Sequence, residues 1–183
     1  MIYFTSDPHF GHKGVIEYCN RPFDSVEEMD EQLIKNWNDT VSKKDTIYIL
    51  GDMFFGTKDH AIKILERLNG QKFLIYGNHD SRLRSGSFAK FFQWRGDLKE
   101  MKVGDQRFVL CHFAMRTWHK QHKGAIQLYG HSHGRLRDDP YALSLDVGVD
   151  NMNYRPVSSD EVMSYMVGLK LPMKDMAPDR ENK

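Results

Sequence analysis

Histidine, aspartate and asparagine side chains gather in five short motifs, and these are residue types that bind divalent metal ions. Each motif lies at the end of a run of strand-forming residues or just after it. The motifs are Asp7-Pro8-His9, Gly51-Asp52, Gly77-Asn78-His79-Asp80, Cys111-His112 and Gly130-His131-Ser132-His133. A donor set of carboxylate, imidazole and amide groups suits borderline ions such as manganese, iron, zinc or cobalt. The residue types therefore predict a metal site.

The motifs supply seven candidate ligands, which are too many for one ion. They are Asp7, His9, Asp52, Asn78, His112, His131 and His133. A closed zinc site takes four ligands. Two ions that share a bridging carboxylate would use all seven, and two ions about 3.5–4 Å apart can hold a phosphate and activate water near neutral pH. We therefore expect a dinuclear hydrolytic site.

Six short apolar runs predict the strands that must position these motifs. They cover residues 2–5, 46–50, 73–76, 108–111, 126–129 and 143–147. Most of them end at glycine, aspartate or asparagine, where a strand gives way to a loop. Loops at strand ends are where sites assemble in α/β folds.

Helical patterns lie between the predicted strands. Ser25 with Glu28 has the spacing of a capping box before a helix that extends to about residue 41, and Ser158 with Glu161 has the same spacing before another. A further helix is expected over 61–68, and residues 81–93 are expected to be partly helical. We expect one domain over residues 1–171 and a polar tail over 172–183.

Composition and hydropathy bear on the cellular location and on the kinds of partner. The chain has 183 residues, a net charge of +1 and two cysteines. This balance neither indicates a nucleic-acid partner nor rules one out. No signal peptide and no apolar run of about 20 residues is found, so we expect a cytoplasmic protein without a membrane partner. The oligomeric state stays open.

The five motifs, in their order from Asp7 to His133, resemble those of the calcineurin-like metallophosphoesterases. The order in that family is Asp-x-His, Gly-Asp, Gly-Asn-His-Glu/Asp, an isolated His, and Gly-His-x-His. The resemblance implies an α/β fold, a four-layer αββα sandwich in which helices flank two packed mixed β-sheets. It also implies a dinuclear metal site at the strand ends.

The resemblance also implies a role for each motif residue. Asp7, His9 and His133 would hold the first metal, and Asn78, His112 and His131 would hold the second. Asp52 would bridge the two ions, and a hydroxide between them would attack the phosphate. His79 would contact the phosphate and protonate the leaving group. We expect both divalent ions to be manganese, and iron, zinc, cobalt or nickel are the alternatives.

One departure from the family narrows the expected activity. In the Ser/Thr protein phosphatases of this superfamily, Gly-Asp is followed by a second Asp, which orients the catalytic His, and by an Arg, which grips phosphate. Here Asp52 is followed by Met53-Phe54-Phe55-Gly56, so both groups are missing. This argues against protein phosphatase activity, and the partner that orients His79 is not identified by the sequence.

Several residues are candidates for substrate binding. His12, Arg82 and Arg116 lie close to the motifs, and Arg116 begins a basic, aromatic loop that extends to Lys123. Such side chains can stack on bases, so we expect a phosphodiesterase that acts on a nucleotide or a nucleic-acid end. The alternatives are a phosphomonoesterase of small phosphates and a non-catalytic metal-binding module. His60 is expected at the surface, and Asp150 as a loop residue.

Overall fold

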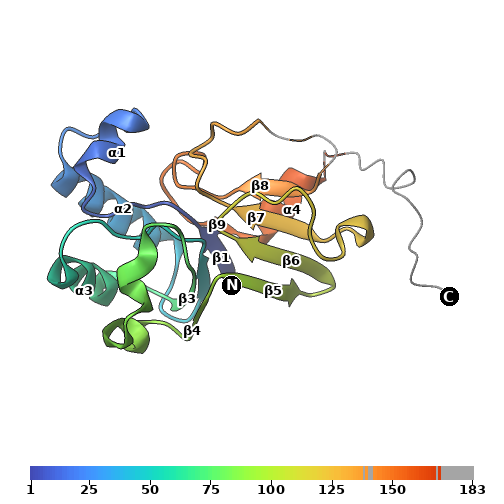
Figure 1. Cartoon of the computed structure of the whole chain (residues 1–183), viewed down its shortest axis with the longest axis horizontal. Coiled ribbons are helices and arrows are strands. Elements are labelled where there is room, and N and C mark those ends of the chain that lie inside the picture. Colours follow the sequence, from blue (N-terminus) through green and yellow to red (C-terminus); the bar gives the residue numbers. More distant parts are fainter. Residues whose placement is uncertain (138, 140–141, 168, 170–183) are drawn as a thin grey trace.

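Two mixed β-sheets pack face to face, and helices flank them (Figure 1). The structure is a computed structural model, and it describes residues 1–137, 139, 142–167 and 169. In order across the first sheet, the strands are β4 (Trp94–Gly96), β3 (Gln71–Ile75), β2 (Thr46–Ile49), β1 (Ile2–Thr5) and β9 (Val157–Ser158). Those of the second are β5 (Leu98–Val103), β6 (Gln106–Cys111), β7 (Ile126–Tyr129) and β8 (Ser144–Asp146). The predicted fold class is confirmed.

Parallel pairing brings the motif-bearing strand ends to one edge of each sheet. Strands β1 to β4 are mutually parallel, and so are β6 to β8. The outer strands β9 and β5 run antiparallel to their neighbours. A bridge between Ser6 and Gly148 joins the two sheets at this edge. The loops that follow β1, β2, β3, β6 and β7 therefore meet.

The alternation of side chains along the strands divides the core in two. Phe4, Leu50 and Ile75 lie in a cluster between the sheets, together with Phe108 and Leu110 of β6. The intervening side chains of the first sheet pack on its other face against helices. That cluster contains Ile47, Ile49 and Leu74 from the strands and Leu33, Trp37 and Leu65 from the helices. The period of two is what an extended strand buried on both faces produces.

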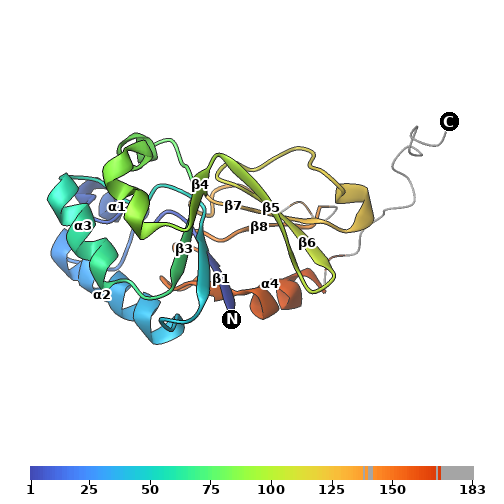
Figure 2. The same cartoon turned by 90° about the horizontal axis from the view of Figure 1, so that it is seen from below.

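In the described residues, four α-helices accompany the sheets: α1 (Lys13–Tyr18), α2 (Val26–Thr40), α3 (Lys58–Arg67) and α4 (Ser159–Met166). The view in Figure 2 separates α2 and α3, on one side of the first sheet, from α4, which packs against β1 and β9. The Ser158–Glu161 capping box is complete. At α2, the Ser25 hydroxyl accepts from Glu28 N, but the Glu28 carboxylate accepts from Asp24 N. The second half of that expected box is therefore shifted by one residue.

Some elements differ from the expectation. The partly helical stretch forms two 3₁₀ helices, η1 (Asp80–Arg84) and η2 (Gly86–Phe91), and η3 (Gln121–Lys123) lies in the loop after β6. No apolar run marked strand β5, because it is a charged outer strand. Only Met101 and Val103 of β5 reach the core between the sheets. Helix α1 is too short for its period to be visible.

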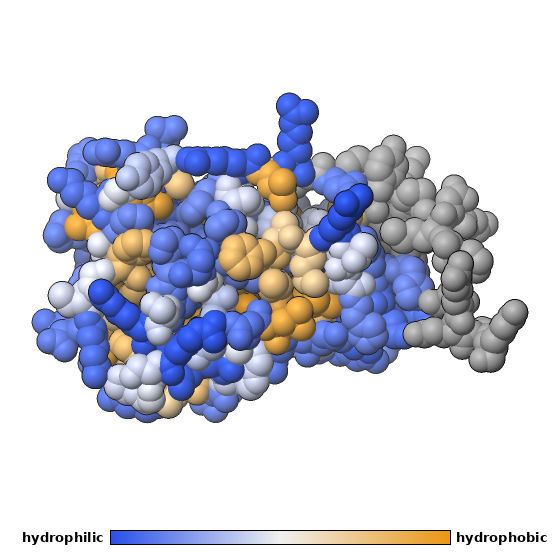
Figure 3. All heavy atoms as spheres, in the orientation of Figure 1, coloured by the Kyte–Doolittle hydropathy of each residue, from blue (hydrophilic) through white to orange (hydrophobic). Residues whose placement is uncertain are grey.

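The predicted tail over 172–183 lies outside the described residues. The domain boundary at residue 171 stays a prediction for the same reason. Among the helices of the described part, none combines the length and the apolar character that a membrane span requires. On the face shown in Figure 3, hydrophobic residues gather near the centre and hydrophilic residues surround them.

Candidate active site

The loops after the parallel strands bring all five motifs together. Asp7, His9, Asp52 and His112 are buried and form the floor of the site. Asn78, His79 and His131 are exposed and form its mouth. The site is therefore enclosed below and open to a substrate above.

Two groups of candidate metal ligands lie next to each other. Asp7, His9 and His133 form the first, and Asp52, His112 and His131 form the second. In the first group, Asp7 Oδ1 lies 3.7 Å from His9 Nε2 and 4.0 Å from His133 Nε2.

A single carboxylate oxygen lies between the two groups. Asp52 Oδ2 is 3.5 Å from His112 Nε2 in its own group and 3.8 Å from His9 Nε2 in the other. On the side of the second group, Asn78 Oδ1 lies 3.0 Å from His112 Nε2. Asp52 thus has the position that a bridging ligand requires.

Two buried atoms without hydrogen-bond partners in the described part of the chain also indicate that the first group fits a metal ion. Asp7 Oδ1 and His9 Nε2 are buried atoms without a hydrogen-bond partner among the described residues. Leaving a buried polar atom unsatisfied costs about 1–3 kcal/mol, and more for a charged one. Two atoms that each lie about 2.1 Å from one ion are about 3.0–4.2 Å apart at angles between 90° and 180°. The distances in the first group lie within this range, so an ion would satisfy both atoms.

The backbone at the ligands is strained. The φ angles are positive at Asp7 (56°), His9 (52°), Asp52 (52°), His131 (65°) and His133 (49°). Left-handed conformations at residues other than glycine cost of order 1–3 kcal/mol and persist where surrounding contacts hold them. Here such contacts include the hydrogen bonds from Asp7 N to Gly51 O and from His131 N to Asp7 Oδ2, 3.0 and 2.8 Å long.

Glycines in the motifs allow this close approach. A Cβ atom at Gly51 would lie 2.5 Å from Gly77 N and 2.6 Å from His112 Nδ1. At Gly130, a Cβ atom would collide with the side chains of Ser6 and Asp7. Both positions therefore need glycine for the ligands to converge.

Two histidines have a fixed tautomer. His112 Nδ1 lies 2.6 Å from the carbonyl oxygen of Leu50, and His133 Nδ1 lies 2.7 Å from Asp150 Oδ2. Because these oxygens can only accept, each Nδ1 carries the hydrogen and each Nε2 keeps its lone pair for a metal. Burial lowers the pKa of His112, but the hydrogen bond that its protonated Nε2 makes to Asp52 and the charge of Asp7 outweigh burial, and the pKa is raised; a metal ion would take the place of the Nε2 proton.

A buried arginine supports the first group. The Arg21 guanidinium donates to both carboxylate oxygens of Asp150, at 2.8 and 2.9 Å, and to the backbone oxygens of Pro8 and Asp7, at 2.8 Å each. Burial raises the pKa of Asp150, but His133 and Arg21 outweigh it, so the pKa is lowered. Asp150 was expected as a loop residue, and its link to His133 shows that it orients a candidate ligand.

We expect Asp150→Asn to weaken metal binding and to lower kcat/KM about 10–100-fold, the usual loss when a partner of a metal ligand is changed. The amide can still accept from His133 Nδ1, but it lacks the charge that polarises the imidazole and pairs with Arg21. The measurement is bound metal per chain during a chelator titration. Asp105→Asn, at the exposed turn between β5 and β6, is the matched control. Identical retention of metal in the two variants would contradict the role.

His79 stands at the mouth of the site. Its backbone N donates to Asp52 Oδ1 at 2.9 Å, and its Nε2 lies 3.9 Å from Asp52 Oδ2. The ring is 45% exposed and lies 4.7 Å, centre to centre, from Phe55. The sequence did not identify a partner that orients His79, and in the structure its main-chain bond and the Phe55 ring position it.

A cavity of about 370 Å³ opens beside the first group. His12 is in its wall, as the sequence suggested, and its ring stacks on Phe55 with 3.7 Å between ring centres. Burial and the neighbouring His9 and His79 lower the pKa of His12 to about 4, so its ring is neutral near pH 7. Arg135 also lines this cavity, and no motif in the sequence pointed to it.

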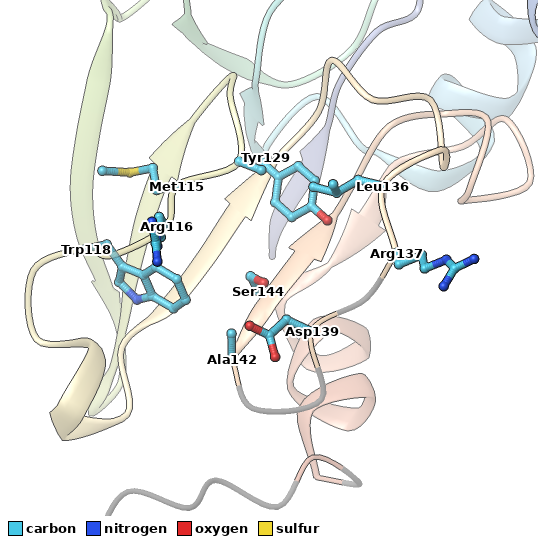
Figure 4. Close-up of a pocket in the computed structure, with 10 residues that line it drawn as sticks. Met115, Arg116, Trp118, Tyr129, Leu136, Arg137, Asp139, Ala142 and Ser144 are labelled. Atoms are coloured by element: carbon cyan, nitrogen blue, oxygen red, sulfur yellow. The ribbon is translucent and has the colours of Figure 1, made fainter. Parts of the chain in front are cut away.

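The two arginines that were candidates for substrate binding do not line this cavity. Arg82 donates to the carbonyl oxygen of Gly56. Arg116 lines a second cavity, of about 290 Å³, whose wall contains none of the seven candidate ligands (Figure 4).

His60, expected at the surface away from the motifs, is partly exposed but supports the loop that carries His9. Its Nε2 lies 2.8 Å from Asp30 Oδ2, and the buried Asp30 carboxylate accepts from Gly11 N at 3.0 and 3.1 Å. Helices α2 and α3 are thereby linked to the loop between His9 and His12. The contact between His60 and Asp30 gave no signal in the sequence, because the two residues are 30 positions apart.

Comparison with known proteins agrees with this geometry. A sequence model of the family described as "Calcineurin-like phosphoesterase" matches residues 1–114. The uncharacterized protein MJ1445 of Methanocaldococcus jannaschii is 38% identical over 173 residues, which cover 90% of each chain. The Gene 66 protein of Mycobacterium phage L5 is 31% identical over 190 residues, covering 87% of this chain and 91% of its own.

Among solved structures, the protein of unknown function AQ665 from Aquifex aeolicus has the same fold. Its TM-score is 0.70 at 22% identity, and the match covers 90% of this chain and 98% of that one. The family match includes the motifs from Asp7 to His112, and MJ1445 extends the likeness over nearly the whole chain. This chain belongs to the calcineurin-like phosphoesterase family.

Proposed function

We propose that the protein is a metal-dependent phosphodiesterase that acts on a nucleotide or a nucleic-acid end. The observation that carries this proposal is the position of Asp52 Oδ2, 3.8 Å from His9 Nε2 and 3.5 Å from His112 Nε2. One carboxylate between two ligand groups is the arrangement that two-metal hydrolysis needs. Membership of a phosphoesterase family supports the same class of reaction.

The residues divide into two ligand sets that share Asp52. Asp7, His9 and His133 would hold one ion, and Asn78, His112 and His131 would hold the other. When bound, two divalent ions supply Lewis acidity at the phosphate and activate a water molecule. Manganese is our first candidate, because the set is made of oxygen and imidazole donors without a thiolate.

His79 would protonate the leaving oxygen. The exposed ring stands over the shared carboxylate, with Nε2 3.9 Å from Asp52 Oδ2, and it belongs to neither ligand group. A general acid has to reach the leaving group from a fixed position. The Phe55 ring and the bond from His79 N to Asp52 supply that position.

Two cavities favour a diester over a monoester, because a diester carries two organic substituents. The cavity of about 370 Å³ is lined by His9 and His133 of the first group. The cavity of about 290 Å³ is lined by Ala114 and Tyr129, each two residues from a ligand of the second group. A phosphate held between the groups would have a cavity for each substituent.

The test is hydrolysis of bis-p-nitrophenyl phosphate and p-nitrophenyl phosphate, measured side by side. The protein is stripped with chelator and then given manganese, nickel, cobalt, zinc or magnesium separately. We expect turnover that depends on the added metal and a higher kcat/KM for the diester. A preference for the monoester would instead identify a phosphomonoesterase. Two bound ions per chain without turnover of either ester would contradict the proposal.

A further inference from the structure

The cavity beside the second ligand group is built from the loops that continue from its ligands. Figure 4 shows Arg116 and Trp118 on the loop after β6, Tyr129 at the end of β7, and Leu136 on the loop that follows His133. Its volume of about 290 Å³ lies just below the range of about 300–1,000 Å³ for small-molecule sites. It therefore suits one part of a substrate whose phosphate lies between the ligand groups.

Phe113 places an aromatic ring beside the second group, and the next residue of the loop, Ala114, lines the cavity. The ring lies 4.9 Å from His112 and 4.7 Å from His131, centre to centre, yet it is 46% exposed. A large apolar side chain held half-exposed at a site mouth is available to a ligand. Aromatic rings stack on nucleic-acid bases of any sequence.

Arg116 adds a positive charge three residues along the same loop. It is exposed, and within the described part of the chain its guanidinium has no hydrogen-bond or ion-pair partner. Arg107 of β6, the strand that precedes this loop, instead pairs with Glu100 at 3.3 Å. An unpaired guanidinium beside a phosphate-hydrolysing site is suited to a second phosphate group.

A buried glutamine fixes the loop that carries both residues. Gln127 of β7 is fully buried; its Oε1 accepts from Met115 N at 3.2 Å and its Nε2 donates to Phe113 O at 3.1 Å. Trp118 anchors the far end of the loop, because its Nε1 donates to Ala125 O at 2.8 Å. The loop is therefore held in place before a ligand arrives, which lowers the entropy cost of binding.

We infer that Phe113 and Arg116 form a nucleotide subsite, in which Phe113 stacks on the base next to the scissile phosphate and Arg116 binds the following phosphate. The inference rests on the proposed function and narrows its substrate class to phosphodiesters that carry at least one further phosphate. Apart from Arg116, Arg137, Asp139 and Ser144, the cavity wall is aromatic or apolar, which matches a base better than a second metal or a sugar alone.

Two pairs of substrates separate the two contacts. The first pair is thymidylyl-thymidine with and without a 5′-phosphate, and the second is thymidylyl-thymidine and its abasic analogue. We expect Arg116→Gln to lower kcat/KM about tenfold more for the phosphorylated dinucleotide than for its partner, and Arg116→Lys to restore part of the difference. We expect Phe113→Leu, which keeps apolar packing, to lower kcat/KM about tenfold more for the dinucleotide with bases.

Lys63→Gln is the charge control, because Lys63 is an exposed residue of α3 on the other sheet. It is expected to leave both substrate ratios unchanged. Calorimetric titration with thymidine 3′,5′-bisphosphate gives a readout that does not need turnover, and both site variants should raise the Kd about tenfold. If the wild type hydrolyses no diester, the proposed function fails while the titration still tests the subsite. Unchanged Kd values, or equal losses within each substrate pair, would overturn the inference.

Discussion

Asp52→Asn is expected to lower kcat/KM for bis-p-nitrophenyl phosphate by about a thousandfold, or about 4 kcal/mol of transition-state stabilisation. The physical reason is that the two carboxylate oxygens of Asp52 have different partners. Oδ1 accepts from His79 N at 2.9 Å, and Oδ2 faces both ligand groups. In the variant, the amide oxygen will take the His79 bond, and the NH₂ group will then point at the metals. An NH₂ group is not a ligand, and it cannot be shared by two ions.

The measurement combines turnover with metal content. Elemental analysis after dialysis is expected to find fewer than two ions per chain in Asp52→Asn. Asp39→Asn, at an exposed aspartate of α2 that pairs with Lys35, makes the same chemical change away from the site and is expected to keep both properties. If Asp52→Asn keeps two ions and more than a tenth of the activity, the carboxylate does not bridge.

The central strands and the motifs at their ends could be predicted, because both depend on residues that are close together in the sequence. Residues 47–50 alternate between the two cores, with Ile47 and Ile49 toward the helices and Tyr48 and Leu50 toward the second sheet. A run that is apolar on both faces signals a central strand, and the glycine and aspartate that follow signal its end. Strand β5 is not apolar on both faces, because Lys99, Glu100 and Lys102 are three of its six residues, so it lacks this signal.

The supporting contacts of the site could not be predicted, because each joins residues far apart in the chain. Arg21 and Asp150 are 129 residues apart, and nothing local distinguishes this buried pair from exposed charges. Gln127 sits in an apolar strand, where its two bonds to the loop after His112 depend on the register of β6 and β7. Sequence patterns identified which candidate metal ligands lie together. The residues that orient them are decided by tertiary packing.

His79→Ala gives the second large effect, and its size depends on the leaving group. General acid catalysis contributes about 10²–10⁴-fold when the leaving oxygen needs a proton. We therefore expect at least a hundredfold loss of kcat for a dinucleotide, whose leaving alkoxide is strongly basic. The loss should be much smaller for bis-p-nitrophenyl phosphate, because p-nitrophenolate leaves without a proton. Metal content should stay unchanged, because His79 belongs to neither ligand group.

This dependence on the leaving group separates proton donation from mere positioning. The bond from His79 N to Asp52 Oδ1 comes from the backbone and persists in the alanine variant, so the shared carboxylate keeps its orientation. His119→Ala, at an exposed histidine that pairs with Glu100, is the matched control and should keep both activities. Were His79→Ala to lose the same factor with both esters, the ring would act by holding the phosphate. A general acid must show the steeper loss with the more basic leaving group, since only that oxygen needs its proton.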